Sequence, residues 1–266
     1  MTTYHTTSIE IKYGTNTQGF FSFEKPKNLI VFVHGFGGDS TRTWNNFLSF
    51  ILFDSYFKNS DIIFYGYDTF KGQASDHSSQ LYDFLNLMNN PLKNNILPAQ
   101  QQLPERNYQF VLLVAHSLGA VLVRQAQLLA YIENKKWVDK SRLALFAPAH
   151  NGAEIIPLAT QALPGLSALL GIFAKFRYPI LNDLNPSDNG ILKAIKEQTN
   201  DLQRQGKAEF SKARLVIHAR GDKIIKSYQY LLDKPAKIVE NSNHVAVCKP
   251  KNGYSDPFEC IKSIIK

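Results

Sequence analysis

The sequence predicts an α/β fold in which a mostly parallel central sheet is covered by helices on both faces and carries a helical cap. First, short apolar runs alternate along the chain with stretches of helical period. Second, the runs at 28–33 and 108–115 are apolar almost throughout, as strands buried on both faces of a parallel sheet are. Third, 266 residues with 44% hydrophobic content are enough for one large core, and no repeat or low-complexity linker divides them. We therefore expect a single domain over residues 1–266, with a cap or lid insertion at about 150–205.

The expected strands and helices follow from the apolar runs and from the stretches of helical period. Two short antiparallel strands start the sheet and six further strands continue it, at 8–13, 20–24, 28–33, 61–66, 108–115, 142–147, 213–219 and 236–240. Helices are expected where apolar residues recur every three to four positions, at 43–57, 78–89, 118–134, 187–204, 223–232 and 256–265.

A glycine-rich loop, 34–39, follows the strand at 28–33. Glycines let such a backbone approach a ligand closely and turn its amides inward. We assign the amide of Phe36 as a donor to a negatively charged oxygen, with Gly37 as the alternative and as a substrate contact. A phosphate-binding loop is disfavoured, because neither Gly-Lys-Ser/Thr nor Gly-x-Gly-x-x-Gly is present. His34 is expected to support the loop rather than to act as a base.

The pentad Ala115-His116-Ser117-Leu118-Gly119 lies between the strand at 108–115 and an amphipathic run. A serine at such a sharp turn is exposed as a nucleophile, and the crowded backbone requires small neighbours on both sides. Gly119 meets this need, and Ala115 makes the turn a variant form. The amide of Leu118 would then be the second donor of an oxyanion hole. The alternative is a buried serine at an ordinary strand–helix turn.

Some 65 residues separate the strand ending near 147 from the one starting at 213, so this insertion needs structure of its own. No charge occurs between Glu154 and Lys175. Prolines and glycines interrupt this run, which argues against a membrane span. An apolar cap that contacts substrate is favoured, and a pair of core helices is the alternative. The substrate-contact candidates are His150, Leu163, Leu166 and Leu170.

Asp222 follows the strand at 213–219, and His244 lies in the loop after the last strand. This order of serine, acid and histidine is the one found in hydrolases with a parallel sheet. A neutral imidazole can take the serine proton, and the carboxylate fixes its tautomer. Asp222 could instead only cap a helix. Asp68, at another strand end, is the backup acid, and His150 is the rival histidine.

Together these motifs resemble the alpha/beta-hydrolase superfamily, and within it the serine esterases related to the serine-active-site-containing lipid-remodelling proteins. The resemblance covers about residues 28 to 265 and rests on 34–39 with Thr43-Trp44, on 115–119, on 147–152, and on 244–250 with Asp256-Pro257. It implies the alpha/beta-hydrolase fold, with Ser117 as nucleophile, His244 as base and Asp222 as acid. The chain departs from the family at two places. Ala115 replaces the usual glycine, and 148–153 reads Pro-Ala-His-Asn-Gly-Ala where Pro-His-Gly-Ser is common.

The net charge of +8 is concentrated near the C-terminus, where residues 205–266 carry twelve Lys or Arg against six Asp or Glu. Such a face can attract an anionic lipid surface, and a plain solvated surface is the slightly preferred alternative. Nucleic acid is not expected as a partner, because the lysines are scattered. We expect no cofactor, and no metal, since neither His-Glu-x-x-His nor paired cysteines occur.

The two cysteines, Cys248 and Cys260, do not make a disulfide framework, which favours a reducing compartment. The N-terminus has neither a basic start nor an apolar core, so no standard secretory signal is expected. A cytoplasmic location is the prediction, with non-classical export as the alternative. The oligomeric state is left open.

The predicted function is a serine hydrolase that cleaves carboxylic esters through an acyl-enzyme, with a lipid or acylglycerol-type substrate favoured over a small polar ester. One alternative keeps the same three residues but passes the acyl group to an alcohol, as an acyltransferase does. Another is a catalytically silent ligand-binding protein of the same fold.

Overall fold

The described strands form one eight-stranded mixed sheet, in the order β1-β2-β4-β3-β5-β6-β7-β8. The structure, a computed structural model, describes residues 3–90, 106–153, 158, 178–183, 190–225, 230–231 and 233–265. The strands are β1 (Ile9–Ile11), β2 (Thr17–Phe20), β3 (Asn28–Val33), β4 (Ser60–Tyr65), β5 (Phe110–His116), β6 (Ser141–Phe146), β7 (Ala213–Ala219) and β8 (Lys237–Val239). β2 is antiparallel to both β1 and β4, and all other neighbours are parallel.

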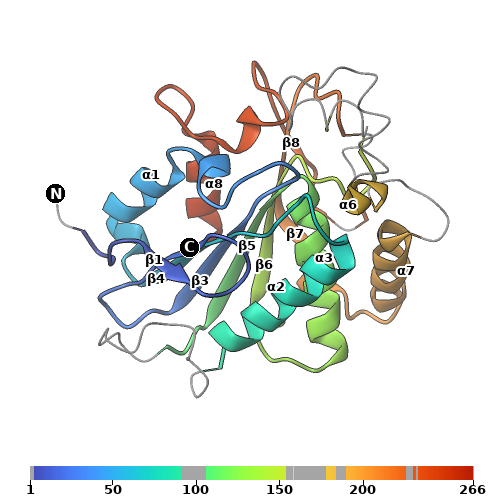
Figure 1. Cartoon of the computed structure of the whole chain (residues 1–266), viewed down its shortest axis with the longest axis horizontal. Coiled ribbons are helices and arrows are strands. Elements are labelled where there is room, and N and C mark those ends of the chain that lie inside the picture. The colour runs from blue at the N-terminus through green and yellow to red at the C-terminus, as the bar shows by residue number, and fades with distance from the viewer. Residues whose placement is uncertain are drawn as a thin grey trace.

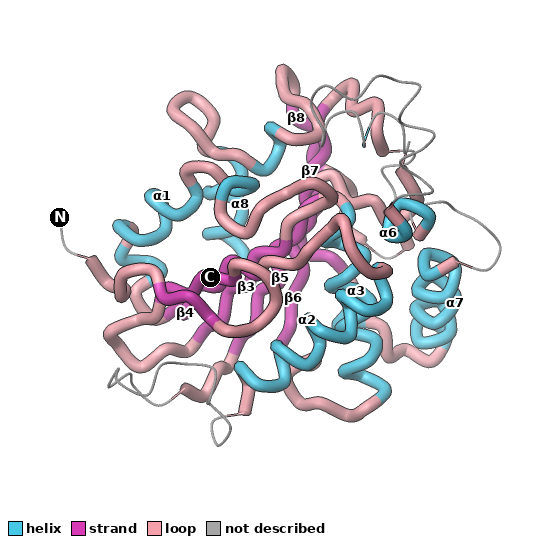
Figure 2. Tube along the Cα trace, viewed as in Figure 1, coloured by secondary structure: helices cyan, strands magenta, loops and turns pink. Residues whose placement is uncertain are grey.

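Helices cover the sheet on two sides (Figure 1). The described helices are α1 (Phe47–Phe53), α2 (Ala74–Met88), α3 (Leu118–Ile132), α6 (Pro179–Asn182), α7 (Ile191–Arg204) and α8 (Asp256–Ile265). Four 3₁₀ helices are described at Arg42–Trp44, Ser55–Phe57, Glu209–Ser211 and Ala246–Cys248. α1 and α8 lie on one side, where the rings of Phe50 and Phe258 are 5.3 Å apart, and α3 packs between α2 and α7 on the other. Figure 2 shows the strands as a twisted band between these two layers.

The centre of the sheet is fully apolar and buried. β3 lies between β4 and β5, in the register Ile30↔Ile62 and Ile30↔Leu112. Apolar side chains cover both faces of β3 and β5, because helices lie on each side. The predicted α/β fold with a mostly parallel sheet is confirmed, and each of the six strands from β3 to β8 matches its predicted range within two residues.

Three predicted helices differ from the structure. The helix predicted over 43–57 is broken, because Asn45 adopts a φ of 50° and Asp54 is extended and accepts a hydrogen bond from the amide of Tyr56. The helix predicted over 78–89 begins four residues earlier, at Ala74, whose amide donates to Asp183 at 2.7 Å. The helix predicted over 223–232 is wrong at its start: Lys223 and Ile224 are not helical, and Ile225 forms an antiparallel bridge with Ala153.

Most of the predicted cap lies outside the described residues. Within 150–205 the structure describes 150–153, Leu158, α6 with its neighbours, and 190–205 with α7. The cap therefore stays a prediction, as does the single-domain organisation. In the described part of the chain, no helix combines the length and the hydrophobicity that crossing a bilayer requires.

A buried polar network ties the sheet together at the amino ends of β4 and β5. One oxygen of the Asp61 carboxylate accepts hydrogen bonds from Arg106 at 2.8 Å and Tyr108 at 2.7 Å, and the other accepts from the amide of Ser22 at 2.9 Å. All four residues are buried. Such a network stabilises a fold only when its charges are well partnered, as they are here.

Candidate active site

Ser117 lies at a strained turn between β5 and α3, at the carboxyl end of the sheet. Its φ of 52° and ψ of −120° are outside the regions that most residues adopt. Two glycines make the turn sterically feasible. A Cβ on Gly119 would stand 2.4 Å from the Val33 carbonyl oxygen, and one on Gly35 would stand 2.8 Å from the Ser117 Cβ. The predicted sharp turn between strand and helix is therefore present.

Three side chains from separate loops form a continuous hydrogen-bonded chain. His244 Nε2 lies 3.0 Å from Ser117 Oγ, and His244 Nδ1 lies 2.9 Å from one carboxylate oxygen of Asp222. All three residues are buried. Because a carboxylate only accepts, Nδ1 carries the proton, and Nε2 is free to accept the serine hydroxyl proton.

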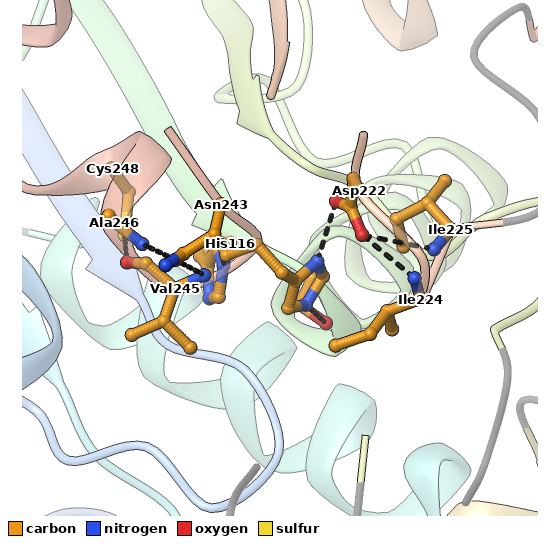
Figure 3. A network of polar contacts seen from close by, with 10 residues as sticks. His116, Asp222, Ile224, Ile225, Asn243, Val245, Ala246 and Cys248 are labelled. Carbon is orange, nitrogen blue, oxygen red and sulfur yellow. Dashed lines mark hydrogen bonds and ion pairs between the residues drawn. The ribbon is translucent and has the colours of Figure 1, made fainter. Parts of the chain in front are cut away.

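The Asp222 carboxylate is held in its charged form. Its second oxygen accepts hydrogen bonds from the amides of Ile224 at 2.9 Å and Ile225 at 3.3 Å (Figure 3). Burial opposes the charge, but the hydrogen bond and charge of His244 together with these two amides outweigh it and lower the pKa of Asp222. The carboxylate is therefore ionised wherever the protein is folded at neutral pH.

His116, the neighbour of the serine, holds the histidine loop in place. Its Nε2 donates to the backbone carbonyl of His244 at 2.8 Å. Burial, with the nearby charge of His244, lowers the pKa of His116 to about 3, so this ring stays neutral. On the other side, Asn243 accepts hydrogen bonds from the amides of Val245 at 3.1 Å and Ala246 at 2.8 Å (Figure 3). The sequence does not predict the bond from His116 to the His244 carbonyl, because only the folded chain brings these two residues together.

The glycine-rich loop contributes one free amide beside the serine. In the described part of the chain, the amides of Phe36 and Leu118 have no hydrogen-bond acceptor, whereas the amide of Gly37 donates to Thr69 at 3.0 Å. Between the two loop amides considered, Phe36 is therefore the one available to a ligand. His34 is stacked on Tyr67 and bonded to the loop carbonyl at Gly35, which is the supporting role predicted for it.

The alternative residues lie elsewhere. Asp68 accepts from the amide of Phe70 and pairs with Lys71, so the backup acid is engaged in its own turn. His150 is buried against Tyr230, with ring centroids 4.0 Å apart, and burial lowers its pKa well below the ordinary value. In the described structure neither of its nitrogens has a hydrogen-bond partner, and the imidazole that reaches Ser117 is that of His244. The substrate-contact candidates Leu163, Leu166 and Leu170 lie outside the described residues.

A cavity of about 260 Å³ opens next to the histidine side of this arrangement. Its described lining comes mainly from the glycine-rich loop, from the 3₁₀ helix that follows it and from the His244 loop, with His116 of β5 and Leu158 in addition: Gly35, Phe36, Gly37, Gly38, Asp39, Arg42, Thr43, His116, Leu158, His244, Val245 and Lys249. His244 and Phe36 thus line a space where a ligand can bind, and Gly35 of the same lining lies next to Ser117.

Comparison with known proteins gives a relationship in structure only. No protein-family model matches the chain, and no curated protein matches it in sequence. A Bacillus licheniformis lipase in mature form superimposes with a TM-score of 0.61 and 16% identity, over 94% of this chain and 98% of its own. Carboxyl esterase 2 from the mycorrhizal fungus Tuber melanosporum gives 0.59 and 16%, over 100% and 87%. The 2-hydroxy-6-oxo-6-phenylhexa-2,4-dienoate hydrolase of Rhodococcus sp. strain RHA1 gives 0.55 and 15%, over 97% and 99%. The chain has the alpha/beta-hydrolase fold, as predicted.

Proposed function

We propose that this chain, with its alpha/beta-hydrolase fold, is a serine hydrolase that cleaves carboxylic esters through an acyl-enzyme. The observation that carries the proposal is the buried chain of hydrogen bonds from Ser117 Oγ through His244 to Asp222. A structural serine has no need of an imidazole whose tautomer is fixed by an ionised carboxylate, whereas a nucleophilic serine does. The solved structures similar to this chain include a lipase and an esterase, which agrees with this chemistry.

The reaction proceeds in two halves. Ser117 Oγ attacks the acyl carbon while His244 Nε2 takes its proton, and the imidazolium then gives that proton to the leaving alkoxide. Water next attacks the acyl-enzyme with His244 again as base. The amides of Phe36 and Leu118 hold the oxyanion of each tetrahedral intermediate, and each such donor contributes a factor of roughly 10²–10³ in rate.

A lipid or other long acyl ester is the proposed substrate class. The uncharged stretch between Glu154 and Lys175 supports this, because an acyl chain needs an apolar surface that excludes water. The excess of basic residues over 205–266 supports, as part of the same proposal, a peripheral contact with an anionic lipid surface.

Covalent labelling tests the assignment of the nucleophile. A fluorophosphonate should label the wild-type protein at Ser117, and Ser117→Ala should abolish both the labelling and the hydrolysis of esters ranging from acetate to palmitate. Ser49→Ala, which changes an exposed serine of α1, serves as the matched control and should label like the wild type. Labelling that persists in Ser117→Ala would reject the proposal.

A further inference from the structure

The cavity lies beside His244, and this position indicates which part of a substrate the cavity binds. The imidazole that takes the Ser117 proton must return it to the leaving oxygen, so the alcohol part of an ester has to lie on the histidine side. His244 and Val245 line the cavity on that side, and Gly35 and Phe36 line it next to the serine. At about 260 Å³ it is smaller than the 300–1,000 Å³ typical of drug-sized ligands, so it suits a head group rather than a whole lipid.

Two cationic side chains border this cavity, from segments far apart in the chain. Arg42 belongs to the turn after the glycine-rich loop, and Lys249 follows the His244 loop. Their neighbours are bonded to each other, since the Cys248 thiol donates to the Thr43 carbonyl at 3.5 Å. Burial raises the pKa of Cys248 to about 12, so the sulfur keeps the proton that this bond needs. The fold therefore holds the two cations beside one space.

Arg42 and Lys249 form no ion pair within the described structure. Two other lysines of the C-terminal segment, Lys237 and Lys262, pair with Asp256 and Asp54. Among the described residues, by contrast, no carboxylate forms an ion pair with the guanidinium of Arg42 or the ammonium of Lys249.

Among the described residues of the lining, Asp39 is the one carboxylate, and one of its oxygens is engaged locally. That oxygen accepts hydrogen bonds from the amides of Thr41 at 3.0 Å and Arg42 at 2.9 Å and from the Thr41 hydroxyl at 3.2 Å. Burial opposes its charge, but these bonds and the Arg42 charge lower the pKa of Asp39. With His116 neutral, the described residues of the lining carry two cations against one anion, so they favour a negatively charged ligand group.

We propose that Arg42 and Lys249 bind a phosphate carried by the alcohol part of the ester, which makes an acyl ester of glycerol phosphate a preferred substrate class. This inference rests on the proposed function and deepens it. The two side chains act as specificity determinants: they hold the leaving alcohol where His244 Nε2 can protonate its oxygen. The bonds to phosphate are charge-assisted, which makes them stronger than bonds between neutral groups.

A pair of water-soluble esters that differ only in charge tests the proposal: 1-hexanoylglycerol and 1-hexanoylglycerol 3-phosphate. The wild-type protein should have a kcat/KM about 100-fold higher for the phosphate ester, as two charge-assisted contacts of about tenfold each allow. Arg42→Gln and Lys249→Gln should each lower the ratio of the two kcat/KM values by about tenfold, and the double variant should abolish the preference. Raising the salt concentration should increase KM for the phosphate ester alone.

The matched control is Lys251→Gln, which removes a positive charge two residues from Lys249 but outside this cavity's lining. It should keep the wild-type ratio, and thermal melting should show that all variants are folded. The inference would be overturned if the wild type had equal kcat/KM for the two esters, or if Lys251→Gln changed the ratio as much as Lys249→Gln does. In either case, hydrolysis of the neutral ester would still support the proposed function. If inorganic phosphate inhibits hydrolysis of the neutral ester but the phosphate ester is not preferred, the site binds free phosphate and the proposal is wrong. Loss of the proposed function itself would be recognised by the absence of both fluorophosphonate labelling and neutral-ester hydrolysis.

Discussion

At the scale of single residues, the Asp222 carboxylate forms hydrogen bonds both to the backbone of its own loop and to the imidazole of His244. One carboxylate oxygen accepts from His244 Nδ1, and the other accepts from the amides of Ile224 and Ile225. The local bonds fix the direction of the carboxylate, so the orientation of the imidazole depends on a short turn. The two sequence-based readings of Asp222, as acid and as a cap for following amides, are thus compatible, although the described residues directly after it, 223–225, are not helical.

Replacing Asp222 by Asn should lower kcat by roughly 10⁴ with little loss of stability. The amide oxygen can still accept from the two backbone amides, but the amide NH₂ would face Nδ1 and favour the tautomer with the proton on Nε2, which cannot take the serine proton. Steady-state kinetics and urea denaturation measure the two effects. Asp68→Asn, the variant of the backup acid, should have wild-type kcat, and a large loss there would contradict the assignment.

At the scale of elements, the approach of α3 to the end of β3 determines whether the serine turn can form. The helix begins at Leu118, and the backbone of Gly119 passes the carbonyl oxygens of Val33 and His34 with no space for a side chain. The requirement for small residues was predicted from the pentad alone. The strand that causes it could not be identified from the sequence, because the contact joins residues far apart in the chain.

Gly119→Ala should destabilise the protein by about 1–3 kcal/mol, because its Cβ would overlap the Val33 carbonyl oxygen and displace the start of α3. Fluorophosphonate labelling should be strongly slowed, since the shift moves Ser117 and the amide of Leu118. The matched control is Gly206→Ala, at a site with no atom within 4 Å of the added Cβ, although its φ of +69° costs some strain. Similar labelling rates in the two variants would show that this close approach does not shape the site.

A strand or helix is predicted correctly from the sequence where local contacts determine it, and incorrectly where contacts with distant residues do. The apolar runs at 28–33 and 213–219 match β3 and β7, because a strand buried on both faces needs an uninterrupted apolar segment. The helix expected over 223–232 fails at its start, because Ile225 pairs with Ala153 in an antiparallel bridge. Helical periodicity contains no record of this long-range contact.

At the scale of the whole molecule, folding buries several imidazoles in neutral form. Burial lowers the pKa of His34 to about 4, and burial with the charge of His244 lowers that of His116 to about 3. Burial likewise lowers the pKa of His218 to about 4 and that of His150 well below its ordinary value. These groups link the stability of the fold to the pH of the solution.

The free energy of unfolding should be highest above about pH 6.5 and should decrease as the pH falls towards 4. In this interval the unfolded chain binds protons at these histidines and the folded protein does not, so acid favours unfolding. Each fully buried imidazole contributes a loss on the order of 2 kcal/mol between pH 6.5 and 5. Urea denaturation at a series of pH values measures the change. An unfolding free energy that is equal at pH 7.5 and 5 would contradict the burial of these rings as neutral groups.

The order of the site residues was readable from the sequence, but the cavity was not. Ser117, Asp222 and His244 each follow a recognisable strand, so their meeting at one edge follows from the topology of a parallel sheet. Arg42 and Lys249 carry no such signal, since each is one basic residue among 30. Their pairing depends on a contact between two loops, at Thr43 and Cys248, that no local pattern encodes.

The buried network around Asp61 and the chain of bonds around His244 lie at opposite ends of the parallel strands and share no residue. Substitutions in the loops that bind substrate can therefore accumulate without disrupting the Asp61 network that joins β4 to β5. The same separation makes the Asp61 end the rational place to attach this protein to a support or a fusion partner.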